Sequence, residues 1–144
     1  MLNYVYSSIF DSPSDYYVNP VNCFGVMGSG LARVFKERYP ENYLAYRSYC
    51  QNKLLKPGHL FIYKENDKHI INMATKYRWE DNSKIEWIRL GLEQLVFKYE
   101  SSLTTPIAMP MIGTGKGKLQ ASEVLFEIHN YLLTTRLLVN LHFY

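Results

Sequence analysis

A lysine- and glycine-rich segment, Gly113-Thr114-Gly115-Lys116-Gly117-Lys118, follows a short apolar run and precedes an amphipathic stretch. It therefore lies between an expected strand and an expected helix. Alternate glycines let the backbone adopt positive φ angles and turn successive N–H groups inward, an arrangement that suits phosphate oxygens. The positive end of the following helix would add to the attraction. We predict that Gly113–Gly117 binds phosphate; a plain turn with a helix cap is the alternative.

A second segment of similar character, Asn22-Cys23-Phe24-Gly25-Val26-Met27-Gly28-Ser29-Gly30, also lies between an expected strand and helix. Neither segment has the glycine spacing of a P-loop or of a dinucleotide-binding fingerprint. ATP or GTP hydrolysis by the P-loop route and a Rossmann dehydrogenase are therefore disfavoured. Two such loops at strand ends predict a site for a nucleotide diphosphate.

The composition is that of an ordinary globular chain: 144 residues, 47% hydrophobic and 20% charged, with a net charge of +3. This mild charge suits an anionic ligand better than it suits a general nucleic-acid binder, which usually has clustered Lys and Arg. The two cysteines, Cys23 and Cys50, form no metal-binding pattern, and no secretory leader or long apolar run is found. We expect one cytoplasmic, monomeric domain over residues 1–144, with neither metal nor cofactor.

Hydrophobic periodicity indicates strands that alternate with helices. A capping box, Ser83-Lys84-Ile85-Glu86, is expected to begin the clearest helix, in which Ile85, Ile88, Leu92, Leu95 and Tyr99 share a face. Such a sequence predicts an α/β fold with helices on both faces of a mixed sheet of about six strands, and both glycine loops at the carboxyl ends of strands. The expected strands are Asn3–Ser7, Tyr16–Asn22, His59–Tyr63, His69–Ala74, Pro106–Ile112 and Leu137–Tyr144, and the other helices begin near Gly30, at Glu41 and at Gln120.

Four segments in register resemble macrodomains, three-layer α/β/α proteins that bind ADP-ribose. They are Val18–Ala32, Lys56-Pro57-Gly58, Ile71–Lys76 and Ile107–Gly115. The likeness is greatest to the branch that holds the terminal ADP-ribose glycohydrolase and the antitoxin paired with DNA-ADP-ribosylating toxins. The compact size and the tyrosine-rich strands also resemble small macrodomain proteins of T4-like phages.

The resemblance implies a role for each matching position. Ser8 and Ile9 fall where the family contacts adenine, with Ser8 in place of the usual acidic residue. Asn22 would face the distal ribose. Gly28, Ser29 and Gly30 would contact that ribose and a phosphate, and the diphosphate would lie on Gly113, Thr114, Gly115, Lys116 and Gly117. Lys76 matches the lysine that this branch uses at the anomeric carbon C1″ of ADP-ribose.

Lys76 is the expected catalytic residue. As a neutral amine it would attack C1″, and as a cation it would stabilise the leaving group; the first role needs a pKa lowered by burial or by a nearby cation. Arg78 is a candidate cation, and Tyr77 and Trp79 are candidates to exclude water. The animal glycohydrolase has an acid at the position of Gly117, which the antitoxin branch lacks. Glu80 and Asp81 are candidate substitutes, and Cys23 is expected to be a buried core residue.

These residues favour a hydrolase that acts at C1″ of ADP-ribose and releases it from DNA or another macromolecule. Two alternatives use the same pocket. One is a phosphatase acting on ADP-ribose 1″-phosphate, which does not need the lysine. The other is a non-catalytic module that binds ADP-ribose or a related nucleotide signal, because loops that hold a diphosphate are the same in binding proteins and in hydrolases.

Overall fold

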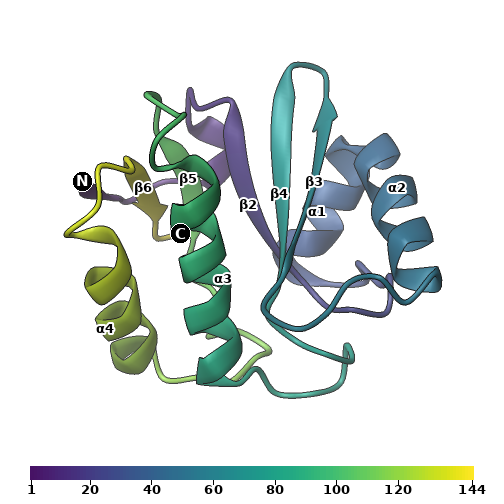
Figure 1. The fold of residues 1–144 in the computed structure, drawn as a ribbon. Coiled ribbons are helices and arrows are strands. Elements are labelled where there is room, and N and C mark those ends of the chain that lie inside the picture. The colour runs from purple at the N-terminus through teal and green to yellow at the C-terminus, as the bar shows by residue number, and fades with distance from the viewer.

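The computed structural model describes residues 1–144 as one six-stranded sheet with helices on each side (Figure 1). The strand order is β1-β6-β5-β2-β4-β3. Every neighbouring pair is parallel except β3 and β4, which form an antiparallel hairpin. The mixed sheet predicted from the sequence is thus confirmed. Its strands are β1 (Leu2–Val5), β2 (Tyr16–Val21), β3 (Leu60–Glu65), β4 (Lys68–Ala74), β5 (Ile107–Pro110) and β6 (Val139–His142).

The helices form the two outer layers. Helices α1 (Gly30–Arg38) and α2 (Pro40–Gln51) pack on one face, whereas α3 (Ile85–Tyr99) and α4 (Ala121–Leu132) pack together on the other (Figure 1). Because successive side chains of a strand point to opposite faces, Val18 joins the core under α3 and α4 while Tyr17 packs against Phe35 of α1. None of these helices is long and apolar enough to cross a membrane.

Helix α3 begins differently from the expected capping box, and that prediction is wrong. Lys84 occupies the N-cap position and no side chain caps the helix. Ser83 is buried; its N–H donates to the carbonyl of Gly117 at 2.9 Å, and its hydroxyl has no partner. Ser83 therefore contacts Gly117, in a loop far away along the chain, and does not cap the helix as the local pattern predicted. The sequence also gave no sign of the short 3-10 helix Ile9–Asp11.

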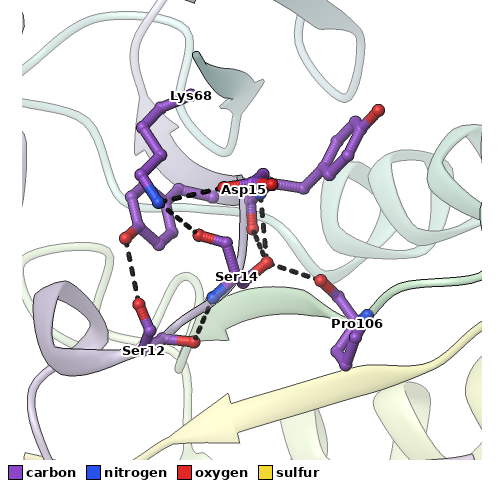
Figure 2. A network of polar contacts seen from close by, with 7 residues as sticks. Ser12, Ser14, Asp15, Lys68 and Pro106 are labelled. Atoms are coloured by element: carbon purple, nitrogen blue, oxygen red, sulfur yellow. Dashed lines mark hydrogen bonds and ion pairs between the residues drawn. The ribbon is translucent and has the colours of Figure 1, made fainter. Parts of the chain in front are cut away.

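The amino ends of the central strands are held by a polar network that we call the serine clasp, formed by Ser12, Ser14, Asp15 and Lys68 (Figure 2). The Ser14 hydroxyl donates to the carbonyl of Pro106, just before β5, and accepts from the Tyr16 N–H at 3.0 Å. Lys68 Nζ donates to Ser14 O at 3.0 Å and to Asp15 Oδ1 at 3.1 Å. The clasp thereby holds β2 between β5 and β4.

Candidate functional site

Three loops meet at the carboxyl edge of the sheet because β5, β2 and β4 are adjacent and parallel. They are residues 22–29 after β2, 75–84 after β4 and 111–120 after β5. The ladder between β2 and β5 joins only Tyr16 to Ile107 and Tyr17 to Ala108, although β2 continues to Val21. The two strands therefore part toward their carboxyl ends. Open α/β sheets bind ligands at such a point, where chain connections leave in opposite directions.

The loop after β5 presents unbonded amides, although not by the expected alternation of positive φ angles. Of its three glycines only Gly113 has a positive φ, +75°. Its carbonyl accepts from Leu119 N at 2.9 Å, and the carbonyl of Gly115 accepts from Lys118 N at 3.1 Å. No N–H from Gly113 through Gly117 donates a hydrogen bond within the protein. Consecutive free amides with Lys116 beside them form a suitable site for an anion.

Gly117 is required by close packing. A Cβ atom at this position would lie 2.3 Å from Ser83 Oγ and 2.5 Å from the Gly113 carbonyl oxygen. Both distances are far shorter than van der Waals contact, so no side chain fits while the loop keeps this shape. The carboxylate that the animal glycohydrolase carries at the matching position is therefore excluded here by packing. Ser83, the residue that closes this space, was missed as part of the site because its position suggested a helix cap.

The loop after β2 is organised by the buried side chain of Asn22. Its Oδ1 accepts from Phe24 N at 2.9 Å and its Nδ2 donates to Val26 O at 2.7 Å. The fully buried Tyr46 of α2 donates its hydroxyl proton to Asn22, at 2.7 Å from the carbonyl and 3.0 Å from Oδ1. The Asn22 amide thus bonds to its own loop, and its contact with a ribose stays a prediction. Nothing in the sequence singled out Tyr46.

The same loop leads into α1 through Gly28, Ser29 and Gly30, which are all exposed. Gly30 has a positive φ of +58°, and Ser29 is the N-cap residue but makes no side-chain capping bond. The backbone amides from Gly28 to Ala32 have no acceptor within the protein. The positive end of α1 is therefore open to an anion, at the edge of the sheet that the loop after β5 shares.

Lys76 follows β4, and its ammonium donates to the carbonyl of Trp79 at 3.3 Å. Partial burial lowers the pKa of Lys76, the nearby cations Lys116 and Lys118 lower it further, and Asp81 opposes them. The expected cation, Arg78, instead lies over the rings of Phe24 and Tyr77. The cations that act on Lys76 come from the loop after β5, and Lys118 was not predicted. The carboxylate of Asp81 accepts from Arg78 N at 3.1 Å, and Glu80 is exposed.

The side chains expected to exclude water do not enclose Lys76. Tyr77 is 43% exposed and Trp79 60% exposed, so both rings face solvent. Cys23 is buried, as predicted; burial and the neighbouring Cys50 raise the pKa of its thiol to about 12. At ordinary pH this thiol is protonated and is a poor nucleophile. Cys23 connects the loop after β2 to the loop after β4. Its N–H donates to Tyr77 O at 2.9 Å, and its Sγ donates to Lys76 O at 3.4 Å.

Ser8 and Ile9 lie beyond β1, at the same edge of the sheet, because β1, β6 and β5 are successive parallel strands. The Ser8 hydroxyl accepts from Phe10 N at 3.3 Å and caps the 3-10 helix that begins at Ile9. Ile9 is buried against Tyr17 and Phe35. The contact of these two residues with adenine stays a prediction.

The chain has a three-layer α/β/α fold. At the carboxyl edge of its sheet lie a lysine and two loops whose backbone amides make no hydrogen bond within the protein. These features define the class of α/β domains that bind a phosphorylated ligand at that edge. Within this class the chain belongs to the macrodomain family, because the Macro domain model matches residues 18–126. A DNA ADP-ribosyl glycohydrolase of Thermus aquaticus is 35% identical over 136 residues, which is 92% of this chain and 38% of that protein.

Two solved structures support the assignment. The macrodomain of Mycobacterium tuberculosis DarG superposes with a TM-score of 0.92 at 31% identity, over 99% of this chain and 97% of that one. Thermosipho africanus DarTG, solved in complex with ADP-ribose, superposes with a TM-score of 0.90 at 29% identity, over 98% of this chain and 41% of that one. The present chain spans less than two fifths of the length of the curated glycohydrolases it matches.

Proposed function

We propose that this chain binds ADP-ribose where β2 and β5 part and hydrolyses the bond between C1″ of the distal ribose and a DNA base. The observation that carries the proposal is the position of Lys76. Its amine lies close enough to Lys116 and Lys118 for both to lower its pKa, so it adjoins the loop that presents five unbonded amides. The similarity to DNA ADP-ribosyl glycohydrolases over most of the chain supports the choice of substrate.

The loops account for the binding of the ligand. The free amides of Gly113–Gly117 and the positive end of α1 would hold the two phosphates between them. The distal ribose would lie beside Gly28–Gly30, next to Lys76, and adenine would lie toward Ser8 and Ile9. The network of Asn22 and Tyr46 supports the backbone of the loop that the ribose would contact.

The chemistry follows from the protonation state of Lys76. In its neutral form, which a lowered pKa makes more abundant, the amine attacks C1″ and the bond to the base breaks. The departing base takes the proton that the amine loses on bonding to C1″. Water then adds its hydroxyl group to C1″ and a proton to the lysine nitrogen, which releases ADP-ribose and restores the amine. A Lys76 that acted only as a cation would instead stabilise the leaving group. Arginine keeps the positive charge but is not a nucleophile at ordinary pH, so Lys76→Arg separates the two roles.

The decisive experiment follows release of ADP-ribose from an ADP-ribosylated single-stranded oligonucleotide. We expect Lys76→Ala and Lys76→Arg each to lower the rate by at least about 100-fold, while calorimetry with free ADP-ribose gives nearly unchanged affinity. Lys64→Ala is the matched control, since Lys64 is exposed on β3 and makes no ion pair. Undiminished release by Lys76→Ala contradicts the proposal, and activity in Lys76→Arg alone contradicts the nucleophilic role.

Two further measurements test the alternatives. Phosphate release from ADP-ribose 1″-phosphate that persists in Lys76→Ala, with no release of ADP-ribose from the oligonucleotide by the wild type, would identify the phosphatase. Binding of ADP-ribose without turnover of any 1″-linked substrate would identify a binding module. Either result contradicts the proposed glycohydrolase.

A further inference from the structure

Two exposed aromatic rings are in contact next to Lys76: Phe24 of the loop after β2, and Tyr77, the residue after Lys76. The Phe24 ring is 47% exposed and meets Tyr77 edge to face, with ring centroids 5.0 Å apart. The Arg78 guanidinium lies 5.6 Å from the centroid of the Phe24 ring. The backbone bond from Cys23 N to Tyr77 O fixes these two rings next to each other. Large apolar rings that stay in solvent next to a reactive residue need an explanation other than folding stability.

A pocket of about 410 Å³ continues from Phe24 toward the helices. Its walls are the loop from Phe24 to Gly28, Lys36 of α1, and Tyr43, Arg47 and Gln51 of α2. The ammonium of Lys36 lies 4.5 Å from the centroid of the Tyr43 ring. No Asp or Glu lines this pocket, and neither Lys36 nor Arg47 takes part in an ion pair. The pocket is therefore cationic and open to an anion.

We propose that these rings and this pocket bind the single strand of DNA that flanks the ADP-ribosylated base. Bases stack on Phe24 and Tyr77, and phosphates of the strand contact Arg78, Lys36 and Arg47. The geometry favours a single strand, because stacking on a protein ring needs a base whose face is free of its neighbours. This inference rests on the proposed function for the choice of DNA, and it assigns to this chain a second binding surface, between the loop after β2 and helices α1 and α2.

Alternating cations and aromatic faces are the usual composition of such a surface. Aromatic rings stack on any base without reading the sequence, and cations follow the backbone. An acidic peptide would satisfy the cations but would leave the ring faces without stacking partners. The mild net charge of +3 agrees with a short track for a few nucleotides. It does not suit a large non-specific DNA surface.

The first experiment measures binding of a labelled, unmodified single-stranded oligonucleotide by fluorescence anisotropy over a series of salt concentrations. The double variant Lys36→Gln/Arg47→Gln removes two phosphate contacts. The slope of log K against log salt should then become shallower by about 1.4, since each contact on a single strand contributes about 0.7. Lys64→Gln/Lys98→Gln changes the charge equally, on exposed lysines of β3 and α3 outside the pocket, and should keep the wild-type slope. Equal slopes in the two double variants overturn the inference.

The second experiment separates stacking from general apolar contact. Phe24→Ala and Phe24→Leu should each weaken binding of the oligonucleotide at least about five-fold, whereas Phe24→Tyr, which keeps a ring face, should bind as the wild type does. Duplex DNA of the same sequence should bind more weakly than the single strand. Tighter binding of duplex DNA, of single-stranded RNA or of a polyglutamate peptide overturns the choice of partner.

A third comparison keeps this inference separate from the proposed function. Lys76→Ala should bind the unmodified strand like the wild type even though it releases no ADP-ribose. Lys36→Gln/Arg47→Gln should raise the KM for an ADP-ribosylated oligonucleotide about five-fold or more. The same variant should leave kcat/KM for an ADP-ribosylated mononucleotide unchanged. Failure of the wild type to release ADP-ribose would contradict the proposed function, while loss of strand binding in the pocket variants would still support this surface.

Discussion

Polar groups at the amino end of the central strands are hydrogen-bonded to one another, whereas many at the carboxyl end are not. At the amino end the serine clasp bonds its members to one another and to Pro106, and Lys68 lies 3.1 Å from Asp15. At the carboxyl end the amides of Gly113–Gly117 donate to nothing within the protein. The lysines there have cations as neighbours. Both ends belong to the same three parallel strands, so the sheet itself does not cause the difference.

The pKa shifts of Lys68, at the amino end, and Lys76, at the carboxyl end, show this difference. Partial burial is the largest single influence on the pKa of Lys68 and lowers it, but the hydrogen bond and charge of Asp15, together with Tyr17 and Tyr39, raise it by more, so the net shift is upward. Partial burial lowers the pKa of Lys76 as well, and there Lys116 adds to the effect, with Asp81 as the only opposing carboxylate. Groups that satisfy each other hold a fold together, whereas unsatisfied groups remain available to a ligand. The serine clasp therefore serves stability and the carboxyl edge serves function.

The largest effect is expected from Gly117→Ala, at the carboxyl end. The added methyl would overlap Ser83 Oγ and the Gly113 carbonyl. We expect the free energy of unfolding to fall by about 1–3 kcal/mol, with loss of most ADP-ribose affinity, as measured by thermal unfolding and calorimetry. Gly115→Ala is the matched control, because a Cβ there meets nothing within 4 Å and φ is not positive. Equal behaviour of the two variants would show that packing at Gly117 does not shape the loop.

Ser14→Ala tests the amino end. It removes the hydroxyl that bonds Pro106 O and Tyr16 N. Leaving such groups unsatisfied should lower the free energy of unfolding by about 1–3 kcal/mol, and the melting temperature by about 2–4 °C for each kcal/mol. The affinity for ADP-ribose, measured below the transition, should stay that of the wild type. A parallel loss of affinity would mean that the two ends are coupled.

Tyr46→Phe is expected to have a smaller effect, felt in both stability and binding. It removes the bonds to Asn22 O and Oδ1, which should lower the free energy of unfolding by about 1 kcal/mol. Because these bonds shape the loop after β2, ADP-ribose affinity should fall several-fold. Tyr49→Phe, in the same helix, loses a hydroxyl that makes no hydrogen bond within the protein and keeps the ring stacked on Phe61, so it should change neither stability nor binding. Identical results for both variants would show that the Tyr46 hydroxyl does not support the loop after β2.

The pH dependence of release should shift in opposite directions in two variants. If the neutral amine of Lys76 reacts, activity rises as pH increases through its pKa. Lys116→Gln removes a cation that lowers this pKa, so the rising limb should move to higher pH. Asp81→Asn removes the carboxylate that raises it, so the limb should move to lower pH, while the amide oxygen can still accept from Arg78 N. Rate profiles against pH check both signs, and shifts in the same direction would contradict the assignment.

Much of the fold follows from local pattern. Alternation of apolar residues located all six strands, and β2 and β4 are right to within one residue at each end. Helix α1 begins at Gly30, as expected, and α2 begins at Pro40, one residue before the expected Glu41. Strands β5 and β6 are shorter than predicted, because the apolar run of each extends beyond its ladder pairs.

The local pattern of the chain is enough to show which loops follow which strands, and hence that both glycine segments lie at the carboxyl ends of strands. It is enough because hydrophobic periodicity is a short-range property of the chain. Packing in three dimensions puts Ser83 against Gly117 instead of at a helix cap, and it makes Lys116 and Lys118 the cations near Lys76. It alone brought Phe24 beside Tyr77 and Arg47. Such contacts join residues far apart along the chain, and no local pattern encodes them.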